Sequence, residues 1–233
     1  DEYSVEHELS EIHGAQSAHS GQPTEEDDRY ALFQAIWKNK EALEQFANHC
    51  VTEYSVETVL FLLEYAKFRL LIKERYTDFI EDEEEQKTFV QNVQQIQEEQ
   101  DFGVQIKPEL LRTHPLQRRL NVTDVVNLVE YLYTQFIDDQ SVTQVNISGR
   151  IRNKLDDVFA KYDLLQLTEE EYSVSSMLCE MMSEFEAAST ELAFLLYRDS
   201  FPRFCKTKEY REFVHSQSSV KGRAMSPSTA SAI

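Results

Sequence analysis

The segment "VETVLFLLEYAKFRLLI", residues 56–72, places apolar side chains on nearly every face of a helix. A surface helix carries its apolar residues along one stripe, whereas a helix that is apolar all round is enclosed by other elements. We therefore expect residues 56–72 to form the central helix of a bundle, with Leu60 in the core. Ser55 directly precedes the run and is its predicted N-cap.

Helical periodicity also marks the segments on either side of this central helix. Apolar residues recur at spacings of three and four in six further segments, and no segment shows the alternation of a half-buried strand over a useful length. Five glycines and five prolines in 233 residues leave few tight turns. The fold class is therefore predicted to be all-α. The six stripes are Leu32, Phe33, Ile36 and Trp37; Leu43, Phe46 and Cys50; Phe89, Val93 and Ile96; Val125, Leu128, Val129, Leu132 and Phe136; Ile151, Leu155, Val158 and Phe159; and Met177, Met181 and Phe185.

Single residues predict several helix boundaries. Ser4 is the candidate start of a short, isolated helix. Thr168 and Glu171 form a capping box ahead of a later helix. The segment "STELAFLLYRDSFPRFCKTKEYREFV", residues 189–214, predicts a helix, a break near Asp199–Pro202 and a terminal helix.

Composition divides the chain into three parts. Residues 1–28 are polar and form a predicted flexible leader, and residues 216–233 are rich in serine and alanine and are predicted to be a disordered tail. Residues 29–215 form one predicted helical domain. Because the first residue is not methionine, we expect the sequence to be a segment of a longer protein.

Charge and cysteine content exclude several classes of partner and site. A net charge of −19 disfavours nucleic acid and flat adsorption to an anionic membrane. Cys50, Cys179 and Cys205 show no metal-ligand spacing, which favours reduced thiols in an intracellular setting. No apolar run reaches the length of a transmembrane helix, and the chain has no signal-like start.

The sequence signatures of catalysis are absent. The chain contains no GxGxxG, GxxxxGK[ST], GxSxG or HExxH. His49 and Cys50 are neighbours, and neighbouring residues point to different faces of a helix, so they do not suggest a Cys/His dyad. We therefore predict a binding protein that is not itself an enzyme, with no cofactor, no metal and no small-molecule substrate.

The stretch "YRDSFPRFCKTKEY", residues 197–210, resembles the end of the regulator of G-protein signalling (RGS) domain. The family pattern there is Asp-Ser, two variable positions, Arg-Phe and a Tyr six residues later. Here these positions hold Asp199, Ser200, Arg203, Phe204 and Tyr210.

Two further segments resemble the family in the correct order. "TEYSVETVLFLLEYAKF", residues 52–68, is similar to a Glu-x-Ser-x-Glu-Asn motif that opens the central helix. "LYTQFIDDQSVTQVNI", residues 132–147, is similar to an Ile-Tyr-x-x-Phe-Ile motif followed by Val-Asn. Phe185 stands where the family has a buried Phe in the preceding helix. The matching residues are Glu53, Ser55 and Glu57 in the first segment and Tyr133, Phe136, Ile137, Val145 and Asn146 in the second.

The resemblance implies a nine-helix fold in which an antiparallel four-helix bundle is joined to a subdomain of terminal helices. Insertions near residues 74–121 and 155–180 would add helices to it. Phe136, Phe185 and Phe204 are expected in its core. The implied partner is the GTP-bound α subunit (Gα) of a heterotrimeric G protein, which meets the cytoplasmic face of the plasma membrane. The implied function is GTPase activation in G-protein signalling, with membrane proximity only through that partner.

Carried over by position, the Gα-binding surface comes from three regions. Glu53, Tyr54, Glu57 and Thr58 form the first region, Asn146 the second, and Leu195, Asp199, Ser200 and Arg203 the third. Asp199 is expected to accept hydrogen bonds from the partner, and Arg203 to hold its loop by pairing with carboxylates such as Asp199. The residues alone also allow Asp199 and Ser200 to be an ordinary helix cap and Arg203 a simple surface charge.

The chain departs from the family at three positions. Thr58 replaces an Asn that would offer both a donor and an acceptor, which removes a polar contact with the partner. Leu62 replaces a Trp and His49 replaces a Phe, and we interpret both as repacking of the core.

Two other functions remain open from the sequence. The chain could be an RGS-homology scaffold without GTPase-activating function, in which the stripe of Phe89, Val93 and Ile96 is either a docking face or packed on its own bundle. A membrane-associated adaptor has slight support from sparse basic residues near the C-terminus. These are Lys206, Lys208, Arg211, Lys221 and Arg223.

Overall fold

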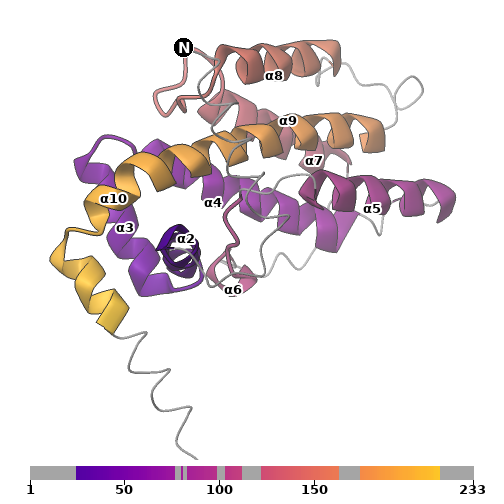
Figure 1. The fold of residues 1–233 in the computed structure, drawn as a ribbon. Helices are drawn as coiled ribbons and strands as arrows, with labels where there is room; N and C mark the ends of the chain where they lie inside the picture. Colours follow the sequence, from indigo (N-terminus) through magenta and orange to yellow (C-terminus); the bar gives the residue numbers. More distant parts are fainter. Residues whose placement is uncertain are drawn as a thin grey trace, which may run out of the picture.

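The computed structural model describes residues 25–76, 80, 83–98, 103–111, 122–162 and 174–215, and every regular element in these ranges is helical (Figure 1). The all-α prediction is confirmed for them. The elements are α2 (Glu25–Ile36), α3 (Lys40–Thr52), α4 (Val56–Leu71), η1 (Ile72–Tyr76), α5 (Glu83–Glu98), α6 (Pro108–Leu111), α7 (Val122–Phe136), α8 (Gly149–Tyr162), α9 (Val174–Leu195), η3 (Leu196–Ser200), α10 (Phe201–Phe204) and a last helix over 208–215.

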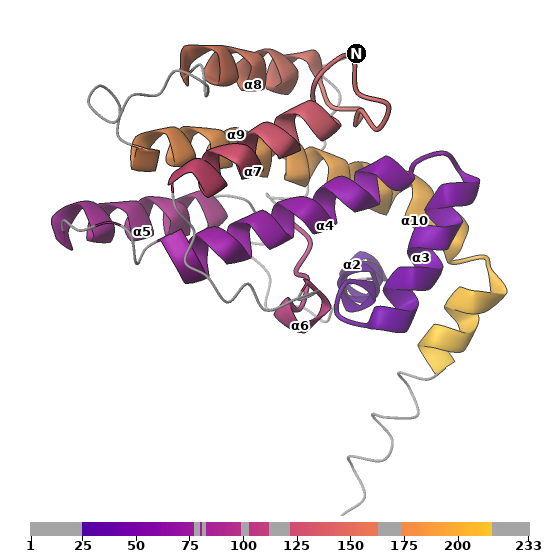
Figure 2. The ribbon, with the colours of Figure 1, turned by 180° about the vertical axis from the view of Figure 1, so that it is seen from behind.

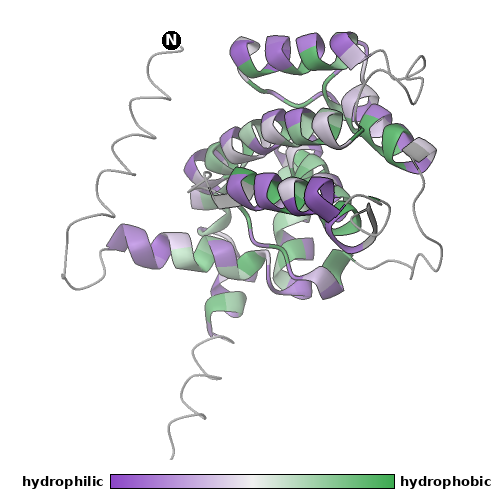
Figure 3. Ribbon diagram, turned by 90° about the vertical axis from the view of Figure 1, so that its right-hand side faces the viewer, coloured by the Kyte–Doolittle hydropathy of each residue, from purple (hydrophilic) through white to green (hydrophobic). Residues whose placement is uncertain are grey.

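The bundle is built from α4, α7, α8 and α9, with α4 packed against α7 and α9 and α8 against α9 (Figures 1 and 2). Aromatic side chains fill its centre. The ring of Phe61 lies 5.6 Å from that of Phe136, and Tyr65 lies 5.8 Å from Phe185. The hydropathy colouring shows hydrophobic residues of α8 on its side toward the bundle (Figure 3). The predicted central position of α4 is confirmed, as are the core positions of Phe136 and Phe185.

The prediction that Leu60 lies in the core is wrong, because this side chain is 41% exposed. Leu60 shares a face of α4 with Glu64 and Lys67, which form an ion pair at 2.6 Å. The helix therefore keeps one stripe toward solvent despite its apolar composition.

The terminal subdomain packs α2 and α3 against η3 and α10 through another set of rings. Phe33 on α2 lies 5.9 Å from Trp37 and 5.3 Å from Phe201, and Phe46 on α3 lies 5.3 Å from Phe204. Edge-to-face and tilted ring contacts of this kind stabilise a core beyond the area that they bury. The predicted core position of Phe204 is confirmed.

Helix α5, inside the predicted insertion at 74–121, packs along α9. Phe89 and Val93 are buried, and Ile96 is half-buried against the core. The interpretation of this stripe as a free docking face is therefore wrong, and packing on its own bundle is confirmed. Burial of a narrow apolar stripe is equally favourable whether the covering surface belongs to the same chain or to a partner.

The predicted break near Asp199–Pro202 is wrong, because α9 runs through η3 into α10 without interruption. The element η3 is one π-helical turn, in which the amide of Phe201 donates to the carbonyl of Leu196. Pro202 follows as one of the first residues of α10, where its missing N–H does not interrupt the helix. The chain turns only at residues 205–207, after which Thr207 Oγ1 accepts a hydrogen bond of 3.2 Å from the amide of Tyr210.

The other boundary predictions have mixed outcomes. Helix α2 begins at Glu25, inside the predicted leader, and its first turn is acidic, which suits the positive end of the helix dipole. Ser55 is the N-cap residue of α4, but its hydroxyl donates to the carbonyl of Cys50 at 3.5 Å and makes no cap bond. The Ser4 start and the Thr168–Glu171 capping box lie outside the described residues. Among the residues that the structure describes, no helix has the length and apolar character needed to cross a membrane.

Candidate functional site

The corner between α3 and α4 is a Schellman motif with a tyrosine at its left-handed position. The amide of Ser55 donates to the carbonyl of Cys50 at 3.0 Å, and that of Tyr54 to the carbonyl of Val51 at 3.3 Å. Tyr54 has φ 56°, a conformation for which glycine is the usual residue. Its side chain is also 92% exposed, so no burial compensates for the strained backbone.

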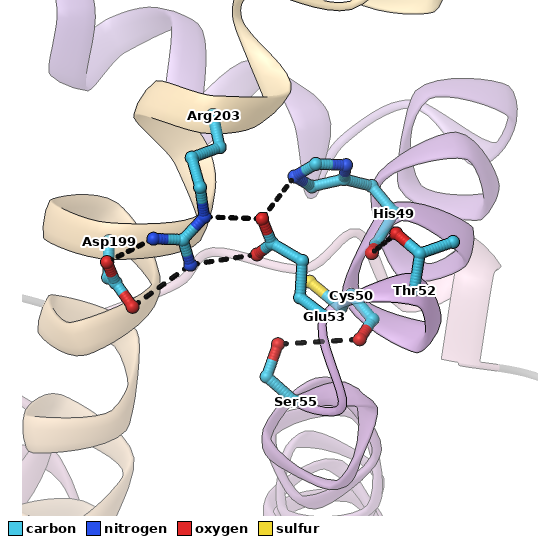
Figure 4. Close-up of polar contacts among 7 residues, drawn as sticks. All are labelled: His49, Cys50, Thr52, Glu53, Ser55, Asp199 and Arg203. Atoms are coloured by element: carbon cyan, nitrogen blue, oxygen red, sulfur yellow. Dashed lines mark hydrogen bonds and ion pairs between the residues drawn. The ribbon is translucent and has the colours of Figure 1, made fainter.

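Arg203 joins this corner to the η3–α10 junction (Figure 4). Its Nε and Nη2 atoms donate to the two carboxylate oxygens of Glu53, the Nη2 bond being 2.9 Å long. Its Nη1 and Nη2 atoms donate to Asp199, the Nη2 bond being 3.0 Å long. The predicted pairing of Arg203 with Asp199 is confirmed, and the interpretation of Arg203 as an unpaired surface charge is wrong.

The ionisation of both carboxylates follows from this arrangement. Hydrogen bonds from Arg203 lower the pKa of Glu53 and the pKa of Asp199. Glu53 in turn, followed by Asp199, raises the pKa of Arg203. Two anions and one cation are therefore held charged at the meeting point of two segments.

His49, which was expected to pack in the core, lies on the side of Glu53 opposite to Arg203. Its Nε2 atom is 3.2 Å from Glu53 Oε1, and its ring centre is 5.5 Å from that of Phe204. The ring packs on the core, as expected, but it also contacts the charged cluster. The spacing of four residues on one helix was the signal for this contact.

The loop between α7 and α8, residues 137–148, presents Asn146 to solvent. Val145 and Ile147 on either side of it are buried, and Asn146 is exposed, as alternation along extended chain requires. The amide of Val145 donates to the carbonyl of Phe136 at 2.9 Å and closes the loop. At the tip of the same loop, Val142 is 97% exposed, which nothing in the sequence pattern had indicated.

Two charged side chains hold this loop in place. Arg152 on α8 donates through Nη1 to the carbonyl of Ile137 and through Nη2 to that of Val145, the latter at 2.9 Å. Glu191 on α9 accepts from the amide of Ser148 at 2.6 Å and from its hydroxyl at 2.8 Å. The backbone around Asn146 is therefore fixed from both ends of the loop.

The remaining predicted site residues differ in accessibility. Glu57 and Leu195 are half-buried. Thr58 is only 7% exposed, so it offers little surface to a partner. Ser200 is buried and makes no helix-cap bond, which contradicts its interpretation as a cap; its hydroxyl instead helps to lower the pKa of Glu53.

The three predicted regions lie at one end of the molecule. Both views place the α3–α4 corner, the α7–α8 loop and the η3–α10 junction near one another (Figures 1 and 2). Segments far apart in the chain thus form one surface, with Tyr54, Asn146 and Asp199 all exposed on it.

The C-terminal basic residues do not form a continuous basic surface within the described residues. Lys208 pairs with Glu212 at 3.4 Å, and Arg211 Nε donates to the carbonyl of Thr207 at 3.2 Å. Lys221 and Arg223 lie outside the described residues. The alternative function of a membrane-associated adaptor therefore stays an untested prediction.

Comparison with protein families identifies the fold. The model of the regulator of G protein signaling domain matches residues 32–213, which is most of the chain and includes every predicted site residue. A search of curated protein sequences found no match to the chain. The length of the family match, together with the bundle and terminal subdomain, shows that the chain belongs to the regulator of G protein signaling domain family.

Proposed function

We propose that this domain is a GTPase-activating partner of a Gα subunit. The observation that carries the proposal is the Arg203 cluster, which ties the α3–α4 corner to the η3–α10 junction beside the loop that presents Asn146. Such a surface is ordered before the partner arrives, which reduces the entropy lost on binding.

In this proposal the domain performs no bond cleavage itself. A Gα subunit carries its own catalytic arginine and a glutamine that orients the attacking water. What a partner adds is preferential binding of the switch segments in their transition-state arrangement, and the barrier falls by the difference between transition-state and ground-state binding.

Each exposed residue has a proposed role in that grip. Asn146, a donor and acceptor on a fixed loop, reaches toward the switch residues around the hydrolytic water. Asp199 accepts hydrogen bonds from a switch backbone or hydroxyl, and Tyr54 supplies an apolar contact with a polar tip. Because Thr58 is almost buried, the surface relies on Glu57 and Tyr54 at the start of α4.

Single-turnover hydrolysis of GTP by Gα, with and without the domain, tests the proposal. Wild-type protein is expected to accelerate hydrolysis, and Asn146→Ala and Asp199→Ala to reduce the acceleration while leaving the thermal unfolding midpoint nearly unchanged. Lys87→Ala serves as the matched control, because Lys87 is exposed on α5 and lies away from the proposed Gα-binding surface. No acceleration of any Gα class by wild-type protein would refute the proposal.

A further inference from the structure

We infer that residues 103–111, inside the insertion predicted at 74–121, form a strap that holds α2 in place and positions η3, the element that carries Asp199. The effect of the strap on the Gα-binding surface passes through α2, where Tyr30 and Gln34 are its positioning residues. The inference rests on the proposed function for its binding test, whereas its exchange test needs no Gα.

The strap is anchored on the bundle by its own apolar side chains. Its first part, residues 103–107, has no regular secondary structure, and its second part is α6, which packs on α4. Val104 and Leu111 are each only 7% exposed, and Ile106 is half-buried against the core. These side chains fix the strap to the bundle, while its backbone meets the terminal subdomain.

Gln34 on α2 binds the backbone of the strap at two points. Its Nε2 atom donates to the carbonyl of Gly103 at 2.6 Å, and its Oε1 atom accepts from the amide of Gln105 at 3.1 Å. In a parallel sheet, one residue of a neighbouring strand would bind the same pair of groups, a carbonyl and an amide two residues apart. The side chain of Gln34 thus takes the place of a strand partner and satisfies backbone groups on either side of the buried Val104.

Tyr30 connects the strap to η3. Its hydroxyl accepts a hydrogen bond of 2.7 Å from Gln34 Nε2 and donates one of 3.4 Å to the carbonyl of Gly103. Its ring meets the ring of Tyr197 edge-on, with the centroids 5.7 Å apart. Tyr197 is a buried residue of η3, two positions before Asp199. One side chain of α2 therefore contacts both the strap and the turn that presents Asp199.

Other side chains of α2 hold the same turn. Arg29 Nε donates to the hydroxyl of Tyr197 at 3.0 Å, and the ring of Phe33 lies 5.5 Å from that of Tyr197 and 5.3 Å from that of Phe201. Tyr197 and Phe201 stand two residues before and two residues after Asp199. Because a close-packed core transmits displacements, the place of α2 sets the place of Asp199.

Backbone amide hydrogen exchange of the isolated domain tests the positioning of η3. In Gln34→Ala, exchange is expected to become about five-fold faster in residues 103–107 and in η3, as for the loss of one ordinary hydrogen bond. Exchange in α8 should stay unchanged. Faster exchange in the strap with unchanged exchange in η3 would overturn the inference, as would unchanged exchange in both.

Two controls separate positioning from a general loss of stability. Gln105→Pro removes the amide that donates to Gln34, whereas Gln105→Ala keeps that amide and loses the exposed bond of 3.1 Å from Lys38, so only the proline variant should speed exchange in η3. Val93→Ala opens a buried site on α5, which lies at the other end of α9 from α10 (Figures 1 and 2). It should lower the free energy of unfolding without changing exchange in η3. Equal exchange in η3 for Gln34→Ala and Val93→Ala would overturn the inference.

Binding of Gα with GDP and aluminium fluoride, a mimic of the transition state, tests the consequence for the surface. Gln34→Ala is expected to weaken binding by about three-fold, and Gln91→Ala, at an exposed position on α5, should match wild type. Tyr30→Phe, which keeps the ring on Tyr197, should weaken binding less than Tyr30→Leu. Wild-type affinity in Gln34→Ala would overturn the inference. Faster exchange in η3 of Gln34→Ala, with no binding of any Gα by the wild-type domain, would retain the strap and refute the proposed partner.

Discussion

Arg203 and Glu53, which are 150 residues apart in the chain, are joined by two side-chain hydrogen bonds, and Arg203 binds Asp199 through two more. The guanidinium group thus connects the helix corner before α4 to the π-helical turn after α9. The planar guanidinium group of arginine can form paired hydrogen bonds with two carboxylates at once. The ammonium group of lysine is a compact charge and cannot form such paired bonds.

Arg203→Lys is therefore expected to weaken Gα binding with little change in the stability of the domain. The variant keeps the positive charge but loses the paired geometry, so affinity for Gα should fall by about ten-fold or more, as in the loss of a charge-assisted hydrogen bond. The free energy of unfolding should change by less than about 1 kcal/mol, because Arg203 is nearly half exposed and exposed pairs contribute little. Titration calorimetry measures the affinity and urea unfolding measures the stability. Unchanged affinity would argue against a role for the Arg203 hydrogen bonds in Gα binding.

Acid should weaken the interactions of Arg203 with Glu53 and Asp199. The folded-state pKa values of Glu53 and Asp199 are lowered by Arg203, so their contribution to stability is present above the ordinary carboxyl pKa of about 4 and is lost as pH falls through the lower folded values. The difference in unfolding free energy between wild type and Arg203→Gln should therefore shrink below about pH 4. A difference that stays constant down to pH 2.5 would contradict the lowered pKa values.

Tyr54→Gly is expected to raise stability and lower affinity together. Glycine relieves about 1–2 kcal/mol of left-handed strain and costs about 0.5–1 kcal/mol of backbone entropy, for a net gain near 0.5–1 kcal/mol. The exposed ring is lost, so binding of Gα weakens. Tyr54→Ala is the control, since it removes the ring and keeps the strain; equal stability of the Gly and Ala variants would contradict the φ of 56°.

Glu186 in the bundle core accepts hydrogen bonds from Tyr65 at 2.8 Å and from Arg69 Nη1 at 2.9 and 2.8 Å. Because the Glu186 side chain is only 4% exposed, Glu186→Ala leaves a partly buried arginine unpaired and should cost about 3–5 kcal/mol in urea unfolding. Replacing both Arg69 and Glu186 by methionine should restore much of the loss. A loss no greater than that of the exposed control Glu84→Ala would show that the pair does not form.

The packing of α5 predicts a contrast between neighbouring residues. Phe89→Ala should lower the free energy of unfolding by about 3 kcal/mol, since it empties a site in the core against α9. Val90→Ala, at a 36% exposed position, should change it by less than about 1 kcal/mol. Equal effects would mean that α5 is not part of the folded core.

The sequence predicted helices well and their solvent-facing stripes less well. The periodicity of α7 and α8 shows which faces are buried, because those helices have one apolar side. In α4 nearly every face is apolar, so periodicity could not single out Leu60 as exposed. The position of an exposed stripe there depends on where α7 and α9 lie, which is a tertiary property.

The residues of the site could be predicted from sequence motifs, whereas the geometry of the site depends on long-range contacts. Asp199 and Arg203 could be paired from their spacing of four, whereas the bond between Arg203 and Glu53 spans 150 residues and has no local signal. Pro202 suggested a break in the helix, but a π-helical turn just before it lets the helix continue. His49 was assigned to the core by substitution alone, although its spacing of four residues from Glu53 was a local signal for their contact.

The most direct test of the proposed function is binding to one Gα subunit in three states: bound to GDP, to a non-hydrolysable GTP analogue, and to GDP with aluminium fluoride, which mimics the transition state. A GTPase-activating domain is expected to bind the aluminium fluoride form tightly and the GDP form weakly, and Asn146→Ala is expected to lose this difference. Equal affinity for all three states would contradict it and would favour a scaffold that uses this fold without activating the GTPase.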